Sequence, residues 1–312
     1  MKIVFVGISG GVDSFYAAKI LLEKGYDVRG YFFDNGYFNP LNAFEACKRL
    51  NIPLTVVKIE KIFKRNIIDY FKQYYLEGKT PNPCAMCNRH IKFGYLLEYA
   101  LEKGADYVST GHYVRIENNV LKKALDESKD QSYFLSLIKK EYLKYLIMPL
   151  GEVIKKDIKP KGYKESQDIC FINKNYREIL PHVKNGYFLD KNGKILGENK
   201  GYINYTIGQR KGLGSFGEKM YVTSIDAKTG NVILGKYEDT LNNIVVLRKV
   251  NLLENIEIGK GYSVKLRYNQ KEIPCTFINK TTIKLKTPSQ VVPGQIATVY
   301  KNDEVVLGAE IS

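Results

Sequence analysis

The stretch that decides the fold is Lys2-Ile-Val-Phe-Val-Gly-Ile-Ser-Gly-Gly-Val-Asp-Ser14, followed by a helix-forming run that ends at Gly25. Residues 2–8 are apolar and predict a buried strand, and residues 14–24 predict a helix with Gly25 as its C-cap signal. The glycines between them let the backbone approach an anion, and the helix start offers N–H groups and the positive end of its dipole. The turn lacks the pattern G-x-x-x-x-G-K-[ST], so it is not the usual γ-phosphate cradle. It predicts an anion-binding turn, and the alternative is a plain glycine turn capped by Ser14.

The alternation of strand and helix continues through the first half of the chain. Further strands are predicted over residues 27–33, 54–59 and 107–110, and helices over residues 42–50, 62–76 and 91–102. Such alternation predicts βαβ units, that is, a parallel sheet with helices on both faces. Ligands of these sheets bind at the carboxyl ends of the strands, where the glycine turn lies.

After about residue 173 the pattern changes to short alternating strands separated by turns. Turn signals occur at residues 190–193, 227–230 and 301–303, and alternating strands at 264–268, 282–286 and 296–300. This pattern is typical of a β-barrel or a sandwich. We therefore expect an α/β nucleotide-binding domain over 1–173, a small β-rich central domain over 174–240 and a C-terminal β-barrel over 241–312.

Composition narrows the class of protein. Hydrophobic residues make up 44% of the 312 residues and charged residues 26%, which excludes a mostly disordered chain. An apolar run of about 18 residues is missing, and the N-terminus lacks the features of a secretory signal, so we expect a cytoplasmic protein without a membrane partner. The formal charge of +15 favours a polyanionic partner such as a nucleic acid, or reflects an ordinary lysine-rich surface.

Cysteine spacing points to chemistry rather than to disulfides. The five cysteines are Cys47, Cys84, Cys87, Cys170 and Cys275. A cytoplasmic chain of this size needs no disulfides, so the C-x-x-C pair at 84–87 indicates redox, metal or persulfide chemistry, with a buried structural pair as the alternative. Two prolines stiffen this loop, and we expect Cys87 just before the helix over 91–102, whose dipole favours the thiolate. With three histidines and no second C-x-x-C, a zinc site is not expected.

Six segments carry a resemblance to a known family. The first, SGGVDS, matches the PP-loop of ATP pyrophosphatases. In chain order the segments are SGGVDS (9–14), TPNPCAMCNRHIKF (80–93), ADYVSTGHYVRI (105–116), KDQSYFL (129–135), ESQDICFI (165–172) and YTIGQRKGLG (205–214). Together they resemble the tRNA-specific 2-thiouridylase family, which implies a PP-loop catalytic domain over residues 1–173.

The resemblance implies a reaction at the wobble uridine of tRNAs for Lys, Glu and Gln. ATP and Mg²⁺ would adenylate the C2 oxygen, and sulfur would then displace AMP to give 2-thiouridine. The base must leave the anticodon stack to be reached. Two alternatives remain open: another PP-loop ligase or sulfurtransferase acting on a different RNA site or a small molecule, and a non-catalytic RNA-binding adaptor.

The same resemblance implies roles for individual residues. Asp13 would act near Mg²⁺ and pyrophosphate, Cys87 would be the nucleophilic cysteine, and Cys170 would carry sulfur as a persulfide. The ATP site would consist of Gly7, Ile8, Ser9, Gly10, Gly11, Val12, Asp13, Ser14, Phe33 and Gly111. The target base would meet Asn82, Pro83 and Cys84, and tRNA would meet His112, Lys129, Asp130, Gln131, Arg267, Tyr268 and Gln295.

One departure from the family pattern concerns the sulfur route. Many relatives have Asp at the position of Cys84, so this chain has a third thiol. Cys84, Cys87 and Cys170 are candidate ligands for three irons of a [4Fe–4S] cluster, whose fourth iron would bind sulfide. Whichever route operates, the resemblance implies a sulfur donor, which would be a sulfur-relay protein, a cysteine desulfurase or free sulfide.

Overall fold

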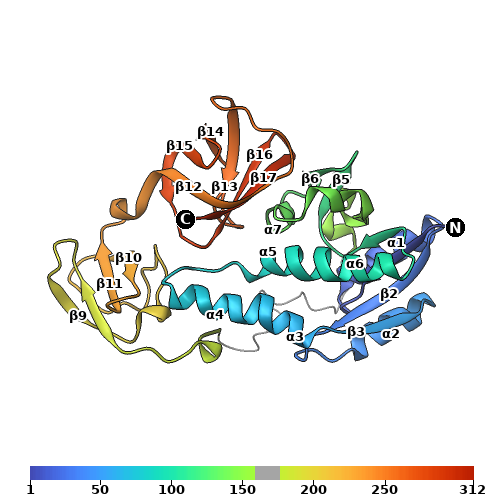
Figure 1. Cartoon of the computed structure of the whole chain (residues 1–312), viewed down its shortest axis with the longest axis horizontal. Coiled ribbons are helices and arrows are strands. Elements are labelled where there is room, and N and C mark those ends of the chain that lie inside the picture. Colours follow the sequence, from blue (N-terminus) through green and yellow to red (C-terminus); the bar gives the residue numbers. More distant parts are fainter. Residues whose placement is uncertain (159–175) are drawn as a thin grey trace.

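A computed structural model describes residues 1–158 and 176–312 (Figure 1). The predicted segment 165–172, with Cys170, lies outside these ranges. The described chain contains a parallel sheet with helices, a small four-stranded sheet and a β-barrel, in that order along the sequence. This architecture confirms the predicted fold class.

The N-terminal sheet has five parallel strands in the order β3-β2-β1-β4-β7. Alternate residues of β1 face opposite sides, so Val4 and Val6 pack on one face and Phe5 on the other. Helices α1 (Val12–Glu23) and α2 (Leu41–Leu50) cover the first face. The strands are β1 (Ile3–Gly7), β2 (Asp27–Asp34), β3 (Leu54–Lys58), β4 (Tyr107–Ser109) and β7 (Leu146–Ile147).

Two long helical stretches contribute to the core on the second face and lie side by side in Figure 1. The second begins at Pro83 and not at residue 91, so the predicted start of that helix was wrong. Asn82 caps it, because its Oδ1 accepts from the Ala85 N–H at 3.1 Å. Segments η1 and η2 are π-helical. The stretches comprise α3 (Glu60–Phe63), η1 (Lys64–Ile68) and α4 (Asp69–Leu76), then α5 (Pro83–Cys87), η2 (Asn88–Tyr95) and α6 (Leu96–Glu102).

The four-stranded sheet follows in the order β10-β11-β8-β9. Turns at residues 190–193 and 227–230 join β8 to β9 and β10 to β11, as predicted. The elements of this part are η6 (Tyr176–Ile179), β8 (Gly186–Leu189), β9 (Ile195–Asn199), η7 (Tyr202–Asn204), β10 (Tyr221–Asp226), β11 (Asn231–Gly235) and η8 (Glu238–Thr240).

The barrel is antiparallel and is closed by pairing of β12 with β17. Its core includes Cys275, and Cys47 is likewise buried under the N-terminal sheet. Burial raises the pKa of the Cys275 thiol to about 12 and that of the Cys47 thiol to about 11, as expected for thiols packed in a core. The strands are β12 (Leu241–Leu252), β13 (Gly261–Lys265), β14 (Ile273–Asn279), β15 (Thr282–Gln290), β16 (Ile296–Lys301) and β17 (Glu304–Ile311).

A hairpin from the N-terminal half extends the barrel sheet, which the sequence pattern did not predict. Strands β5 (Val114–Glu117) and β6 (Val120–Lys123) add to β17, with Lys122 opposite Glu304. Arg115 also donates to Asp303 at 2.7 Å. The N-terminal half and the barrel are therefore fixed to each other by main-chain pairing and by charge.

The remaining short helices lie between β6 and the end of the first described range. They are α7 (Ser132–Leu135), η3 (Lys140–Tyr145), η4 (Pro149–Glu152) and η5 (Lys155–Ile158). Among the described residues, helices of the length and apolarity needed to cross a bilayer are absent.

Candidate active site

The glycine turn lies between β1 and α1, as predicted. The Ser14 hydroxyl donates to the Gly11 carbonyl at 3.0 Å and accepts from the Ser9 N–H at 3.2 Å, which fixes the turn internally. Gly11 is the N-cap of α1 and brings no side chain to the cap. The first N–H groups of α1, which have no partner within the helix, therefore remain available to an anion.

Two glycines allow other segments to approach this turn closely. Gly10 has a φ of +82°, and a Cβ there would lie 2.4 Å from Asn42 Cβ at the start of α2. A Cβ on Gly111 would lie 2.7 Å from the backbone nitrogen of Ser14. Any side chain at either position would displace the turn, so both glycines are required by packing at the carboxyl edge of the sheet.

Asp13 is the centre of a polar cluster that the sequence did not predict. The Tyr113 hydroxyl donates to Asp13 Oδ1 at 2.8 Å, and the Lys155 ammonium forms an ion pair with the same oxygen. Lys155 also lies over the Tyr113 ring, with Nζ 5.4 Å from its centre. The sequence offered a signal for Tyr113, which directly follows the predicted site residue His112. It offered none for Lys155, which lies 142 residues from Asp13 and belongs to no recognised motif.

Phe33 and His112 flank the turn. Phe33 ends 3.5 Å from where a Cβ of Gly7 would lie, and it is half-buried against Tyr31. The Nδ1 atom of His112 lies 2.6 Å from the Thr110 hydroxyl. Burial, with a smaller contribution from the positive charge of Lys92, holds the pKa of His112 well below its usual value of 6.5. His112 is therefore a neutral imidazole in the fold.

The cysteine loop, residues 80–87, consists of three residues before α5 and of α5 itself. Cys84 and Cys87 are both half-buried, and their spacing of three places them on one face of the helix. The prediction that Cys87 lies just before the helix was wrong, because Cys87 is the last residue of α5 and Cys84 lies closer to the helix start. Asn82 fixes the loop from both sides, because its N–H donates to the Tyr70 hydroxyl at 3.3 Å and its Nδ2 to the Tyr133 hydroxyl at 3.5 Å.

The barrel is attached directly to the cysteine loop. Gln295 Nε2 donates to the carbonyl oxygens of Thr80 and Pro81, at 3.2 and 3.3 Å. The Thr80 N–H donates to the Pro293 carbonyl at 2.9 Å. The Tyr133 hydroxyl, which the sequence analysis did not single out, lies 3.0 Å from the Ile296 carbonyl oxygen. Gln295 therefore has a structural role in holding the loop, in addition to any contact with RNA.

The residues predicted to meet tRNA from the 129–131 segment are not equally accessible. Asp130 is 4% exposed, and its oxygens accept from Ala124 N at 3.1 Å and from the Ser132 hydroxyl at 2.8 Å. Gln131 accepts from the Tyr113 N–H at 3.1 Å. Lys129 is half-buried at the end of the same loop. Asp130 thus shapes the loop that presents its neighbours.

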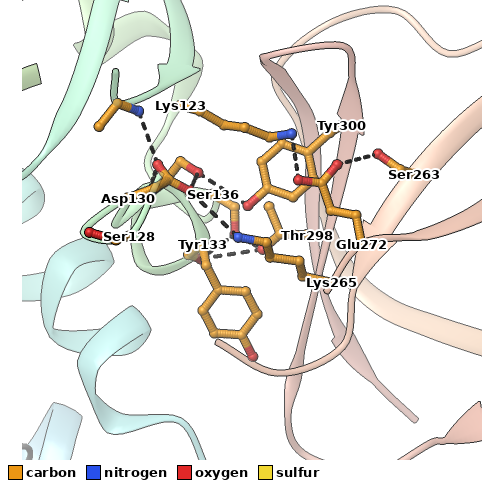
Figure 2. Close-up of polar contacts among 12 residues, drawn as sticks. Lys123, Ser128, Asp130, Tyr133, Ser136, Ser263, Lys265, Glu272, Thr298 and Tyr300 are labelled. Atoms are coloured by element: carbon orange, nitrogen blue, oxygen red, sulfur yellow. Dashed lines mark hydrogen bonds and ion pairs between the residues drawn. The ribbon is translucent and has the colours of Figure 1, made fainter. Parts of the chain in front are cut away.

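A groove of about 440 Å³ separates this loop from the barrel. Figure 2 shows its wall, where Lys265 reaches Asp130 and Lys123 reaches Glu272, the latter pair at 2.5 Å. Tyr268 lines the groove and stacks on Phe134 with ring centres 4.4 Å apart. Arg267 donates to the Ile207 carbonyl at 3.4 Å, and burial lowers the pKa of its guanidinium from the ordinary value.

Two groups of the predicted residues share the second helical stretch, and the residues around the groove form a third group. The glycine turn, Gly111 and His112 form one group, and the Phe93 ring of η2 lies 5.8 Å from the His112 ring. The cysteine loop and Gln295 form the other group. Within residues 1–158 and 176–312, clusters of three or more metal-binding side chains are not found, and the predicted third thiol, Cys170, lies outside those ranges.

Comparison with known proteins agrees with this arrangement. Three family models match consecutive parts of the chain. They are described as the tRNA methyl transferase HUP domain (residues 2–174), the tRNA methyl transferase PRC-barrel domain (175–236) and the aminomethyltransferase beta-barrel domain (245–311).

Whole-length relatives give a more specific assignment. The tRNA-specific 2-thiouridylase MnmA of Helicobacter acinonychis is 40% identical, with 100% of this chain and 99% of that protein covered. Enzymes of the same name from Sulfurimonas denitrificans and Pseudothermotoga lettingae are each 39% identical, covering 99% and 97% of this chain and 98% and 97% of theirs. The chain therefore belongs to the tRNA-specific 2-thiouridylase family.

Proposed function

We propose that the protein is an ATP-dependent tRNA-uridine 2-sulfurtransferase that converts the wobble uridine of tRNAs for Lys, Glu and Gln to 2-thiouridine. The observation that carries this proposal is the match at about 40% identity, from end to end, to enzymes named for that activity. The preformed anion-binding turn and the anchored cysteine loop supply the two sites that such a reaction needs.

The first step activates the base. The C2 oxygen of uridine attacks the α-phosphorus of ATP, the bond to the β-phosphate breaks, and pyrophosphate leaves with the electron pair. The N3 proton of the uridine passes to water in this step, and N3 takes up a proton again when 2-thiouridine forms. The turn over residues 7–14 would hold the phosphates through backbone N–H groups, with Asp13 near Mg²⁺. Phe33 and Gly111 would border the nucleotide. A pyrimidine oxygen is a poor leaving group, whereas the AMP made in this step leaves readily.

The second step replaces that oxygen with sulfur. A sulfur nucleophile attacks C2, and the C2–O bond breaks to release AMP. Asn82, Pro83 and Cys84 would contact the target base, since the contacts of Asn82 with Tyr70 and Tyr133 give that loop a fixed shape. Preorganisation of this kind favours reaction because the loop need not be ordered when the base arrives.

Two routes could deliver the sulfur. In the first, the terminal sulfur of a persulfide on Cys170 attacks C2, and Cys87 then attacks the Cys170 sulfur; this leaves a disulfide that a thiol must reduce. In the second, Cys84, Cys87 and Cys170 hold a [4Fe–4S] cluster. The two described thiols fit as ligands, because they lie one helical turn apart on one face of α5. The cluster would supply an iron that binds sulfide.

The surface suits a tRNA partner. The formal charge of +15 attracts the phosphate backbone, and the predicted contacts His112, Lys129, Gln131, Arg267 and Tyr268 come from both the catalytic half and the barrel. We propose that the chain has three domains, over residues 1–173, 174–240 and 241–312, and that it acts in the cytoplasm. Its sulfur source would be a sulfur-relay protein, a cysteine desulfurase or free sulfide.

The test is reconstitution under anaerobic conditions with ATP, Mg²⁺, tRNA and either sulfide or a persulfide donor. We expect wobble 2-thiouridine in digested tRNA, with AMP and pyrophosphate formed in equal amounts. Asp13→Ala should stop turnover and leave tRNA affinity within about twofold of the unmodified protein, because the nucleotide site is not the main RNA contact. Exposed Asp157 provides the control, Asp157→Ala.

Other outcomes would replace the proposal. Cleavage of ATP to AMP without tRNA would indicate a ligase that acts on a small molecule. Binding of tRNA with no turnover under any sulfur source would indicate an RNA-binding adaptor.

A further inference from the structure

The glycine turn has no positive side chain of its own. Its six residues, 9–14, include one charged residue, and that residue is the acidic Asp13. The dipole at the start of α1 is equivalent to about half a positive charge. The three phosphates of ATP carry about four negative charges, more than one Mg²⁺ and this dipole balance, so a further cation from elsewhere in the fold would stabilise the bound nucleotide.

Lys155 is placed to supply that charge. It is 9% exposed, and its ammonium is paired with Asp13 inside the turn. Its backbone N–H donates to Asp126 Oδ2 at 2.9 Å, which fixes the start of η5. Removing a lysine from water is costly, and a buried ion pair often adds little net stability. A buried lysine at an anion-binding turn is therefore better explained by a ligand than by folding.

We propose that Lys155 binds the β- and γ-phosphates of ATP, and that its pairing with Asp13 is the arrangement without nucleotide. An ammonium on a flexible four-carbon stem is a mobile point charge with three donors. It can move from the carboxylate to the phosphates while the backbone stays fixed by Asp126. Asp13 is then released to act toward Mg²⁺, and Tyr113 keeps its carboxylate in place.

This role also fits the chemistry of the first step. Negative charge grows on the leaving pyrophosphate as the bond to the α-phosphate breaks, and a preorganised cation at that position stabilises the transition state. Lys155 would thus do from a distant part of the chain what the lysine of G-x-x-x-x-G-K-[ST] does from within its own loop.

The proposal rests on the proposed use of ATP, and it differs measurably from a purely structural role. AMP lacks the β- and γ-phosphates. If Lys155 contacts these phosphates, its loss should weaken the binding of ATP and leave the binding of AMP unchanged. A lysine that only pins η5 to the turn would change both affinities equally, or change thermal stability alone.

The experiment compares Lys155→Met and Lys155→Arg with Lys156→Met, in the exposed neighbour on the same element. Calorimetric titration with ATP and with AMP, both with Mg²⁺, gives the ratio of the two affinities. We expect Lys155→Met to weaken the affinity for ATP about 10- to 100-fold, as for the loss of a charged hydrogen bond, and to weaken the affinity for AMP less than about twofold. Lys155→Arg should keep part of the ATP affinity, and Lys156→Met should match the native protein.

An unchanged ratio of ATP to AMP affinity in Lys155→Met would overturn the proposal. If that variant does not fold, amine-reactive labelling of the native protein replaces it: ATP should protect Lys155 more than AMP does, and equal protection overturns the proposal. Equal affinities of the native protein for ATP and AMP would also overturn it, whereas native protein that binds no ATP at all would instead contradict the proposed function.

Discussion

Gln295 on the barrel donates to the carbonyl oxygen of Thr80 in the cysteine loop at 3.2 Å, across 215 residues of sequence. The barrel therefore takes part in shaping the cysteine loop. Because Gln295 was also predicted to contact tRNA, its two roles need to be separated.

Gln295→Ala should loosen the cysteine loop even without tRNA. Two loop carbonyls lose their donor, so we expect the free energy of unfolding to fall by about 1–2 kcal/mol. We also expect faster alkylation of Cys84 and Cys87, measured by mass spectrometry. Gln290→Ala is the control, since the Gln290 side chain donates to Thr240 at the end of η8 and not to the cysteine loop. Unchanged alkylation, with weaker tRNA binding, would leave Gln295 with an RNA contact alone.

Asp130→Asn should lower the stability of the fold, because Asp130 is a buried structural residue. The substitution removes the charge that faces Lys265 and turns one acceptor of the buried site into a donor. We expect unfolding in urea to show a loss of about 1–3 kcal/mol. Glu127→Gln, in an exposed neighbour, should cost nothing measurable. Full stability together with lost tRNA affinity would mean that Asp130 contacts RNA directly.

His112 predicts how stability changes with pH. Its pKa in the fold lies well below the ordinary 6.5, so the unfolded chain binds a proton first as pH falls. The folded protein is therefore fully stable, with respect to this group, above about pH 6.5, and loses stability below it. Between about pH 7 and about pH 5.5, His112→Gln should reduce that loss by about 1 kcal/mol in urea titrations. His182→Gln is the matched control for replacing a histidine by glutamine at an exposed position.

Substitution of the reactive cysteines should affect thiolation but not tRNA binding. Cys87→Ser and Cys170→Ser should each abolish thiolation and leave the tRNA dissociation constant within about twofold, because thiols contribute little to phosphate contacts. Cys275→Ser, in the barrel core, serves as the comparison for loss of a thiol that takes no part in the reaction. Retained activity in either of the first two variants would remove that residue from the mechanism.

Iron analysis separates the two sulfur routes. Anaerobically purified protein with a cluster should contain about four irons and as much acid-labile sulfide per chain, lost in Cys84→Ala. Activity of Cys84→Asp with a persulfide donor and no iron would favour the persulfide route instead.

Local patterns in the sequence were sufficient for much of the fold. The strand from residue 2, the glycine turn and the helix to Gly25 were predicted nearly as observed, because apolar spacing and a positive φ are properties of consecutive residues. The start of the second helical stretch was missed. Prolines suggested a rigid loop there, whereas Asn82 caps a helix with Pro83 in its first turn.

The sequence by itself determined the parallel sheet, the glycine turn, the paired thiols of the cysteine loop and the barrel. Only the tertiary structure decided which partners meet: Lys155 with Asp13, Gln295 with Thr80, and the 114–123 hairpin with the barrel edge. Spacing along the chain encodes local conformation. Contacts between residues more than a hundred positions apart depend instead on how whole layers pack, and no short stretch of sequence records that packing.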